Sequence, residues 1–79
     1  MTDEEVLRQI EQIVRDELDD DEIHLSMTTR ASDVEGWDSL AHIAIVVSVE
    51  HAFGAQFSTS EITTLKDVGH LVRLVQATR

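Results

Sequence analysis

The side chain best placed to do chemistry in this chain is the hydroxyl of Ser39, within residues 36–40, which read Gly-Trp-Asp-Ser-Leu. An apolar stretch with helical spacing follows and runs to residue 53, so Ser39 is expected in the first turn of a helix. The free backbone N–H groups and the positive end of the helix dipole favour a bound anion there. An exposed serine in this setting suits attachment of a phosphate-linked group.

The element that presents Ser39 is a predicted helix from residue 38 or 39 to Phe53, and Gly54 is its natural end. The β-branched residues from Ile43 to Val49 alone would also fit a strand. A length of more than three turns and the flanking signals favour the helix. Its apolar side chains form a surface broader than one buried stripe: Leu40, Ile43, Val46, Val47, Val49 and Phe53.

An amphipathic helix is predicted over residues 3–18, with Thr2 as N-cap and Glu5 completing a capping box. Its apolar side chains recur at helical spacing: Val6, Leu7, Ile10, Ile13, Val14 and Leu18. The acidic tract 19–22 is expected to end this helix, because its charges repel one another at the negative end of the dipole. Residues 19–38 then form a long connection with three apolar side chains that pack onto the bundle: Ile23, Leu25 and Met27.

The C-terminal part predicts a short helix and a longer one. Residues 58–61 offer a capping box for a single turn through Ile62. Thr64 is the expected N-cap of the last helix, with Asp67 at its third position. The buried side of that helix comprises Leu65, Val68, Leu71, Val72 and Val75. The sequence thus predicts an all-α protein, a small four-helix bundle with three main helices and one short helix, forming a single domain over residues 1–79.

Composition excludes several classes of function. The chain has no cysteine, so it forms neither disulfides nor cysteine-based metal sites. No apolar run approaches the ~20 residues that span a bilayer, and the acidic N-terminus lacks the features of a signal peptide. We therefore expect a cytoplasmic protein without a membrane partner. The net charge of −10 argues against nucleic-acid binding, which needs clustered lysine and arginine.

The excess negative charge lies entirely before Ser39. Residues 1–38 hold 13 acidic and 3 basic side chains, whereas residues 39–79 hold 3 of each. One interpretation is a solvated face that keeps the protein soluble. The other is electrostatic steering of basic partner enzymes, and the two are compatible.

Metal binding and intrinsic catalysis find little support in the sequence. The four histidines do not form a ligand set, and surface or partner contacts are the better interpretation for them: His24, His42, His51 and His70. The tract 19–22 lacks the glycine and alternating ligands of an EF-hand loop. No set of nucleophile, base and orienting group is present, so we expect a protein that is not an enzyme.

The motif Asp-Ser-Leu at residues 38–40, followed by Glu50, Phe53 and Gly54, resembles the acyl carrier protein family, and the resemblance extends over nearly the whole chain. It implies that Ser39 is the attachment site of 4′-phosphopantetheine. A phosphopantetheinyl transferase would move this arm from coenzyme A with Mg²⁺. The arm's thiol would then hold an acyl or aminoacyl group as a thioester. A loading ligase and a downstream acyltransferase or synthase are the further expected partners of a monomeric carrier.

The resemblance also suggests roles for neighbouring side chains. Asp38 is either an N-cap, worth ~1 kcal/mol, or a contact to Mg²⁺ or the transferase during loading. Leu40 is either a core residue or, as the family favours, a docking residue. Val47 and Glu50 are further docking candidates, and Trp37 is either an exposed anchor for a partner or a packed lid over the loop.

The interior is expected to hold several apolar residues that in this family can also part to shelter a fatty chain: Ile43, Val46, Val49, Phe53, Ile62 and Val68. Since β-branched side chains are stiff, we favour a plain core, with any cargo short or left outside. Glu50 is the only acid between residues 40 and 53, whereas fatty-acid-synthesis carriers carry repeated acids there. This favours a specialised stand-alone carrier or a discrete polyketide- or nonribosomal-type carrier. The alternative is an unmodified acidic helical adaptor that binds a partner protein.

Overall fold

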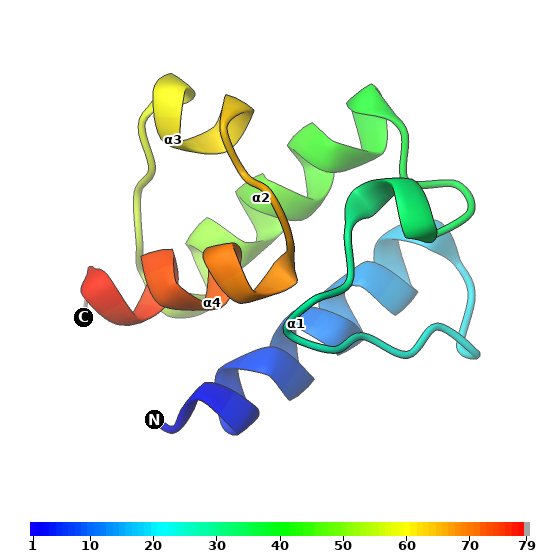
Figure 1. The fold of residues 1–79 in the computed structure, drawn as a ribbon, viewed down its shortest axis with the longest axis horizontal. Helices are drawn as coiled ribbons and strands as arrows, with labels where there is room; N and C mark the ends of the chain where they lie inside the picture. The colour runs from blue at the N-terminus through cyan, green and yellow to red at the C-terminus, as the bar shows by residue number, and fades with distance from the viewer. Residues whose placement is uncertain (79) are drawn as a thin grey trace.

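The computed structural model describes residues 1–78 and contains only helical elements within that range (Figure 1). The elements are α1 (Asp3–Leu18), the 3₁₀ turn η1 (Ala31–Asp33), α2 (Ser39–Phe53), α3 (Thr59–Thr63) and α4 (Val68–Ala77). The predicted all-α architecture of three main helices and one short one is confirmed. The turn η1, inside the long connection, was not predicted from the sequence.

Helix α1 begins and ends where its local sequence dictates. Its capping box is complete, because the Thr2 hydroxyl accepts from the Glu5 N–H at 3.1 Å and the Glu5 carboxylate accepts from the Thr2 N–H at 2.8 Å. At the other end, Asp19 adopts a left-handed conformation with φ 53°, and its N–H donates to the carbonyl of Arg15. A left-handed cap of this kind ends the helix by satisfying a terminal carbonyl.

Helix α2 matches its predicted bounds, but its buried face is turned relative to the prediction. Ile45, Val46 and Val49 are buried, whereas Ile43 is 54% exposed. The assignment of Ile43 to the core was therefore wrong. The helix is apolar nearly all round, so the sequence alone does not mark which side faces inward. Gly54 ends the helix in a left-handed conformation with φ 63°, as expected.

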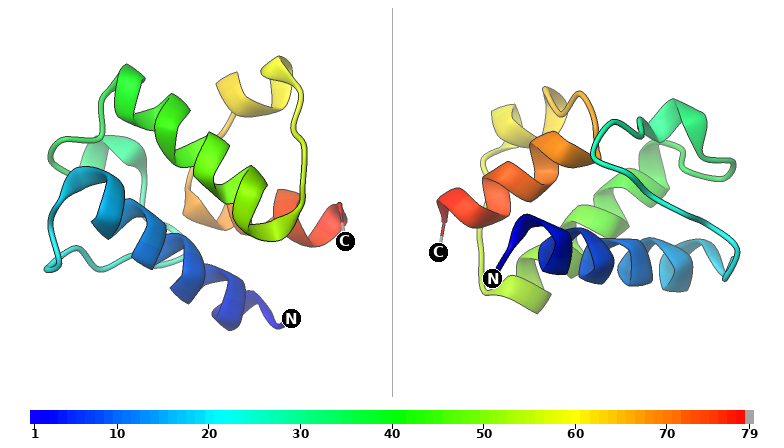
Figure 2. Two further views of the ribbon diagram at one scale, coloured as in Figure 1. Left: turned by 180° about the vertical axis from the view of Figure 1, so that it is seen from behind. Right: turned by 60° about the horizontal axis from the view of Figure 1, so that its bottom comes forward.

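The core lies where α1 packs against α2 on one side and α4 on the other (Figure 2). The buried apolar side chains come from these three helices and from the connections: Val6, Leu7, Ile10, Val14, Ile23, Leu25, Ile45, Val46, Val49, Phe57, Val68, Leu71, Val72 and Val75. Phe53, Ile62 and Leu65 are partly buried against this cluster. The two ends of the described chain lie close together (Figure 1), and the Gln76 side chain donates to the carbonyl of Met1 at 2.7 Å.

Helix α4 begins later than predicted. Asp67, not Thr64, is its N-cap and accepts from the His70 N–H at 2.8 Å. The Thr64 hydroxyl instead donates to the carbonyl of Ser60 at 2.8 Å and so belongs to the end of α3. The predicted N-cap at Thr64 was wrong because a threonine hydroxyl can serve either the end of one helix or the start of the next.

The first turn of α4 is tied to the connection between α1 and α2. The N–H of Val68 donates to the carbonyl of Thr29 at 2.8 Å, and the N–H of Gly69 donates to that of Met27 at 2.7 Å. These bonds satisfy helix N–H groups that would otherwise lack partners. They also hold in place the chain that leads to Ser39.

None of the helices in the described residues is both long enough and apolar enough to cross a bilayer.

Candidate functional site

Ser39 is exposed and is the first residue of α2. The preceding turn depends on Gly36, whose φ of 90° lies in the region that only glycine adopts without strain. Asp38 caps the helix, with its Oδ1 accepting from the Ala41 N–H at 2.9 Å. The sequence prediction of an exposed serine at a capped helix start is thus met in the structure.

An open groove of about 560 Å³ extends from Ser39. Its walls come from η1, the turn before α2, the start of α2 and the end of α3. They include Ser32, Trp37, His42, Ile43, Ile62 and Thr63. The groove combines apolar side chains with a few polar groups, as is typical of sites that hold small organic groups. A flexible arm attached to Ser39 would therefore meet a surface that can hold it.

Trp37 and His42 form a hydrogen-bonded pair beside Ser39. The indole Nε1–H of Trp37 donates to Nδ1 of His42 at 3.1 Å, and the ring centroids are 6.1 Å apart. Nε2 of His42 lies 3.3 Å from the carbonyl oxygen of Ile62 on α3. Of the two interpretations of Trp37, the half-buried ring fits the packed lid better than the exposed anchor.

The position of His42 between Trp37 and α3 was not predicted from the sequence, which favoured a surface or partner contact for this histidine. The available signal was its position three residues after Ser39, which places both on one side of α2. The bond between His42 and the Ile62 carbonyl joins residues 20 apart in the sequence, and no local sequence pattern predicts it.

The docking candidates separate into two groups. Leu40 is 83% exposed and Val47 is 44% exposed, and with Ile43 they form an apolar stripe along the outer side of α2. Glu50 is half-buried, and its carboxylate accepts from the Phe57 N–H at 2.8 Å. Glu50 thus holds the connection after α2, while the stripe of Leu40, Ile43 and Val47 remains exposed among residues 1–78.

Three side chains with displaced pKa values lie on α1, and two of them are carboxylates. The capping-box hydrogen bonds from Thr2 lower the pKa of the Glu5 carboxyl. Burial raises the pKa of Glu11, but hydrogen bonds from the Leu25 N–H and Arg8 outweigh it, and the net shift is downward. Within residues 1–78 no group of three or more metal-ligating side chains comes close enough to hold an ion. What the structure places at Ser39 is an exposed hydroxyl at a helix N-terminus.

Comparison with known proteins assigns this arrangement to a family. The family model for the phosphopantetheine attachment site matches residues 8–75. The fold is similar to the solution structure of a holo acyl carrier protein from Geobacter metallireducens, with a TM-score of 0.85 and 38% sequence identity. That match covers 92% of this chain and 84% of the other. The search of curated proteins gave no match.

Proposed function

Because the chain belongs to the family of phosphopantetheine attachment domains, we propose that Ser39 is the residue that carries its 4′-phosphopantetheine arm. The protein is an acyl carrier, a non-catalytic protein with this covalently attached cofactor. When attached, the arm supplies a terminal thiol that holds an acyl group as a thioester. The observation that carries the assignment is the exposed Ser39 at the capped start of α2, within the matched range.

The residues around Ser39 fit the attached group. A phosphodiester on Ser39 would lie at the positive end of α2, where N–H groups and the helix dipole favour a negative charge. Loading would join the Ser39 oxygen to a phosphorus of coenzyme A, with the bond from that phosphorus to the adenine nucleotide broken. The nucleotide would leave with that bond's electron pair, and the hydroxyl proton would pass to a base outside this chain. Asp38 holds the start of α2 through its bond to Ala41, so the hydroxyl is presented on a fixed helix end.

Intact mass measurement tests the assignment. Wild-type protein, Ser39→Ala and Ser32→Ala are each incubated with coenzyme A, Mg²⁺ and a phosphopantetheinyl transferase of broad specificity. Ser32 is the matched control because it is another exposed serine that lines the same groove. We expect the wild type and Ser32→Ala to gain the mass of the arm and Ser39→Ala to stay unmodified. An arm on Ser39→Ala would overturn the proposal.

The same geometry supports a proposal for partner docking. The carrier interacts with modifying and biosynthetic enzymes, as its family implies. We assign the contact to Leu40, Ile43 and Val47, because they are apolar, exposed and within about two helical turns of Ser39. Glu50 and Trp37 are further docking candidates, but their polar groups are engaged by the Phe57 N–H and by His42. The partners would be a phosphopantetheinyl transferase, an acyl- or aminoacyl-loading ligase, and an acyltransferase or synthase.

The scarcity of acids on α2 supports a specialised carrier. Glu50 is its only acidic residue, and it is committed to the Phe57 N–H. A basic docking patch on a general fatty-acid enzyme would find little to bind there. A dedicated enzyme with an apolar docking surface, of the polyketide or nonribosomal-peptide kind, would suit the stripe of Leu40, Ile43 and Val47.

A further inference from the structure

Trp37 and His42 separate two spaces of very different size. On one side lies the open groove at Ser39, of about 560 Å³. On the other lies a small pocket of about 30 Å³ that reaches the core residues Val68 and Leu71. Trp37 and His42 line both spaces, together with Ala31. They therefore form a shared wall between the groove at Ser39 and the smaller pocket that reaches the core at Val68 and Leu71.

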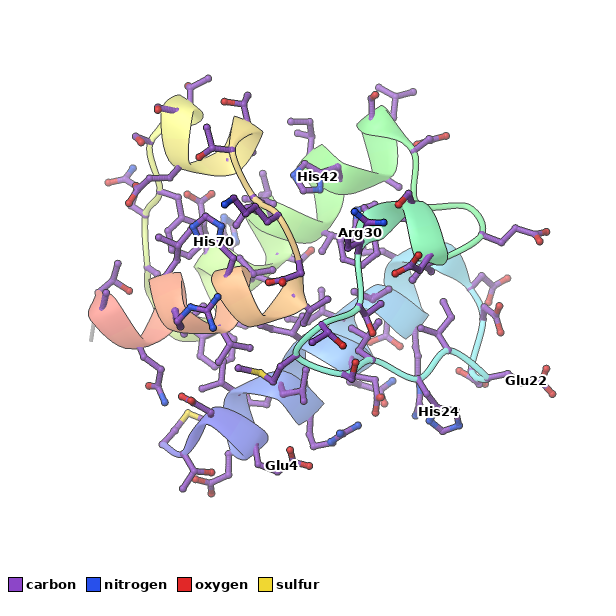
Figure 3. The ribbon with its side chains drawn as sticks, in the orientation of Figure 1. Glu4, Glu22, His24, Arg30, His42 and His70 are labelled. Carbon is purple, nitrogen blue, oxygen red and sulfur yellow. The ribbon has the colours of Figure 1, made fainter. Side chains whose placement is uncertain are left out.

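Hydrogen bonds hold this wall closed from two sides. Since a carbonyl oxygen can only accept, the His42 ring donates from Nε2 to Ile62 and accepts at Nδ1 from Trp37. Both ring nitrogens are thus used, one toward the loop before α2 and one toward α3. Figure 3 shows His42 on α2, with its ring in front of the helix toward the chain between α3 and α4. A single side chain links three segments that would have to part for a chain to enter the core.

The pocket behind the wall is too small for cargo in this conformation. A cavity needs about 10–15 Å³ to hold one water molecule. The pocket of about 30 Å³ therefore holds only about two waters. An alkyl chain of several carbons would have to displace Trp37 or His42 and break one or both of their hydrogen bonds. Cargo can lie in the groove beside Ser39 without moving Trp37 or His42.

We infer that Trp37 and His42 are specificity-determining residues of this carrier. They bar the core to the group held on the arm, so the cargo stays in the groove or in contact with a partner enzyme. The inference rests on the proposed attachment at Ser39 for its biological meaning. It assigns the cargo to the groove and not to the core, so that even a long alkyl chain gains no contact with Val68 and Leu71.

The first test does not depend on Ser39 chemistry. Unmodified full-length protein is titrated with 1-octanol, a free alkyl probe, while the methyl resonances of Val68 and Leu71 are followed by NMR. Two variants open the wall from its two sides, His42→Ala and Trp37→Leu. His51→Ala is the matched control, since His51 is an exposed histidine on the same helix and lines neither space.

We expect saturable shifts of the Val68 and Leu71 methyls in His42→Ala and Trp37→Leu, and no shifts in the wild type or His51→Ala. If one opening variant does not fold, as judged by helical circular dichroism, the other gives the result. Equal shifts in the wild type would show that the wall is not closed. The absence of shifts in every folded opening variant would show that these two rings do not control entry. Either result overturns the inference.

The second test uses the loaded carrier. Wild type and His42→Ala are charged with butyryl and myristoyl groups, with attachment verified by intact mass before any other measurement. We expect the Val68 and Leu71 methyl resonances of the wild type to be the same with both groups, and those of His42→Ala to shift with the longer chain. A shift of these methyls in the wild type that appears only with the longer chain would overturn the inference. Failure to load at all would instead contradict the attachment proposal, and the octanol titration would still decide the role of Trp37 and His42.

Discussion

The carboxylate of Glu11 on α1 accepts a hydrogen bond from the backbone N–H of Leu25 at 2.8 Å, across 14 residues of sequence. Glu11 is only 6% exposed and also contacts Arg8 at 2.7 Å and Arg15 at 3.4 Å. Arg15 in turn donates to the carbonyl of Ile23 at 2.7 Å. One buried acid thus joins the helix to the connection that leads to the attachment motif.

Removing the charge of Glu11 should destabilise the fold. Glu11→Gln keeps the size of the side chain but weakens the bonds to Arg8, Arg15 and Leu25, and we expect a loss of about 1–3 kcal/mol in the free energy of unfolding. Urea denaturation measures it. Glu4→Gln is the control, because Glu4 pairs with Arg8 at the exposed surface, where such pairs contribute at most about 1 kcal/mol. Equal losses in the two variants would contradict a special role for Glu11.

The lowered pKa of Glu11 predicts the sign of an acid effect. Burial raises this pKa, but the hydrogen bonds from Leu25 and Arg8 outweigh it, so the folded state has the lower value. The charged carboxylate therefore stabilises the protein fully above the unfolded pKa of about 4.3. This contribution is lost as the pH falls through the lower, folded-state pKa. The difference in unfolding free energy between the wild type and Glu11→Gln should shrink on acidification in that window, and a constant difference would refute the argument.

The ends of α1 and α2 could be predicted because local sequence signals mark them. The side of α2 that is buried could not, because it depends on contacts with residues far away in the sequence. The bounds of α1 and α2 followed from Thr2, Glu5 and Gly54, because caps act within a few residues. By contrast, the buried face of α2 was misjudged, since an all-round apolar helix gives no side preference of its own. Whether such a face is inward depends on the helices that happen to cover it.

The candidate site divides in the same way. Ser39 and its cap could be identified from a five-residue motif. The roles of Glu11 and His42 could not, because their partners lie 14 and 20 residues away. The groove beside Ser39 likewise arises only when α3 is placed against α2.

The two interpretations of Asp38 can be separated by one substitution. Asparagine caps helices about as well as aspartate, so Asp38→Asn should keep the bond to the Ala41 N–H and the melting temperature. If the carboxylate also contacts Mg²⁺ or the transferase, loading should slow by tenfold or more, equivalent to about 1.4 kcal/mol. The rate is read from the intact mass over time. Unchanged loading in Asp38→Asn would leave only the capping role.

Gly69 is expected to tolerate no side chain. A Cβ built at this position would lie 2.5 Å from the carbonyl oxygen of Met27, which is backbone and cannot rotate away. Gly69→Ala should therefore break the link between α4 and the long connection and cost about 1–3 kcal/mol. Gly54→Asn serves as a comparison, because Gly54 has open space around it and asparagine accepts the left-handed conformation. A melting temperature of Gly54→Asn that is lower than that of Gly69→Ala would contradict this account.

The exposed stripe on α2 predicts how partner enzymes respond to salt. Leu40→Ala and Val47→Ala should change stability by less than about 0.5 kcal/mol, because surface substitutions rarely do more. Each should nevertheless raise the KM of the loading ligase for the holo-protein, since apolar contact with the stripe is lost.

Between low and several tenths molar salt the wild-type KM should change little, because apolar contacts are not screened as charge pairs are. Gln56→Ala, at an exposed position outside the stripe, should leave the KM unchanged. A KM that rises steeply with salt, or that is indifferent to Leu40 and Val47, would move the docking site from this stripe to the acidic residues before Ser39.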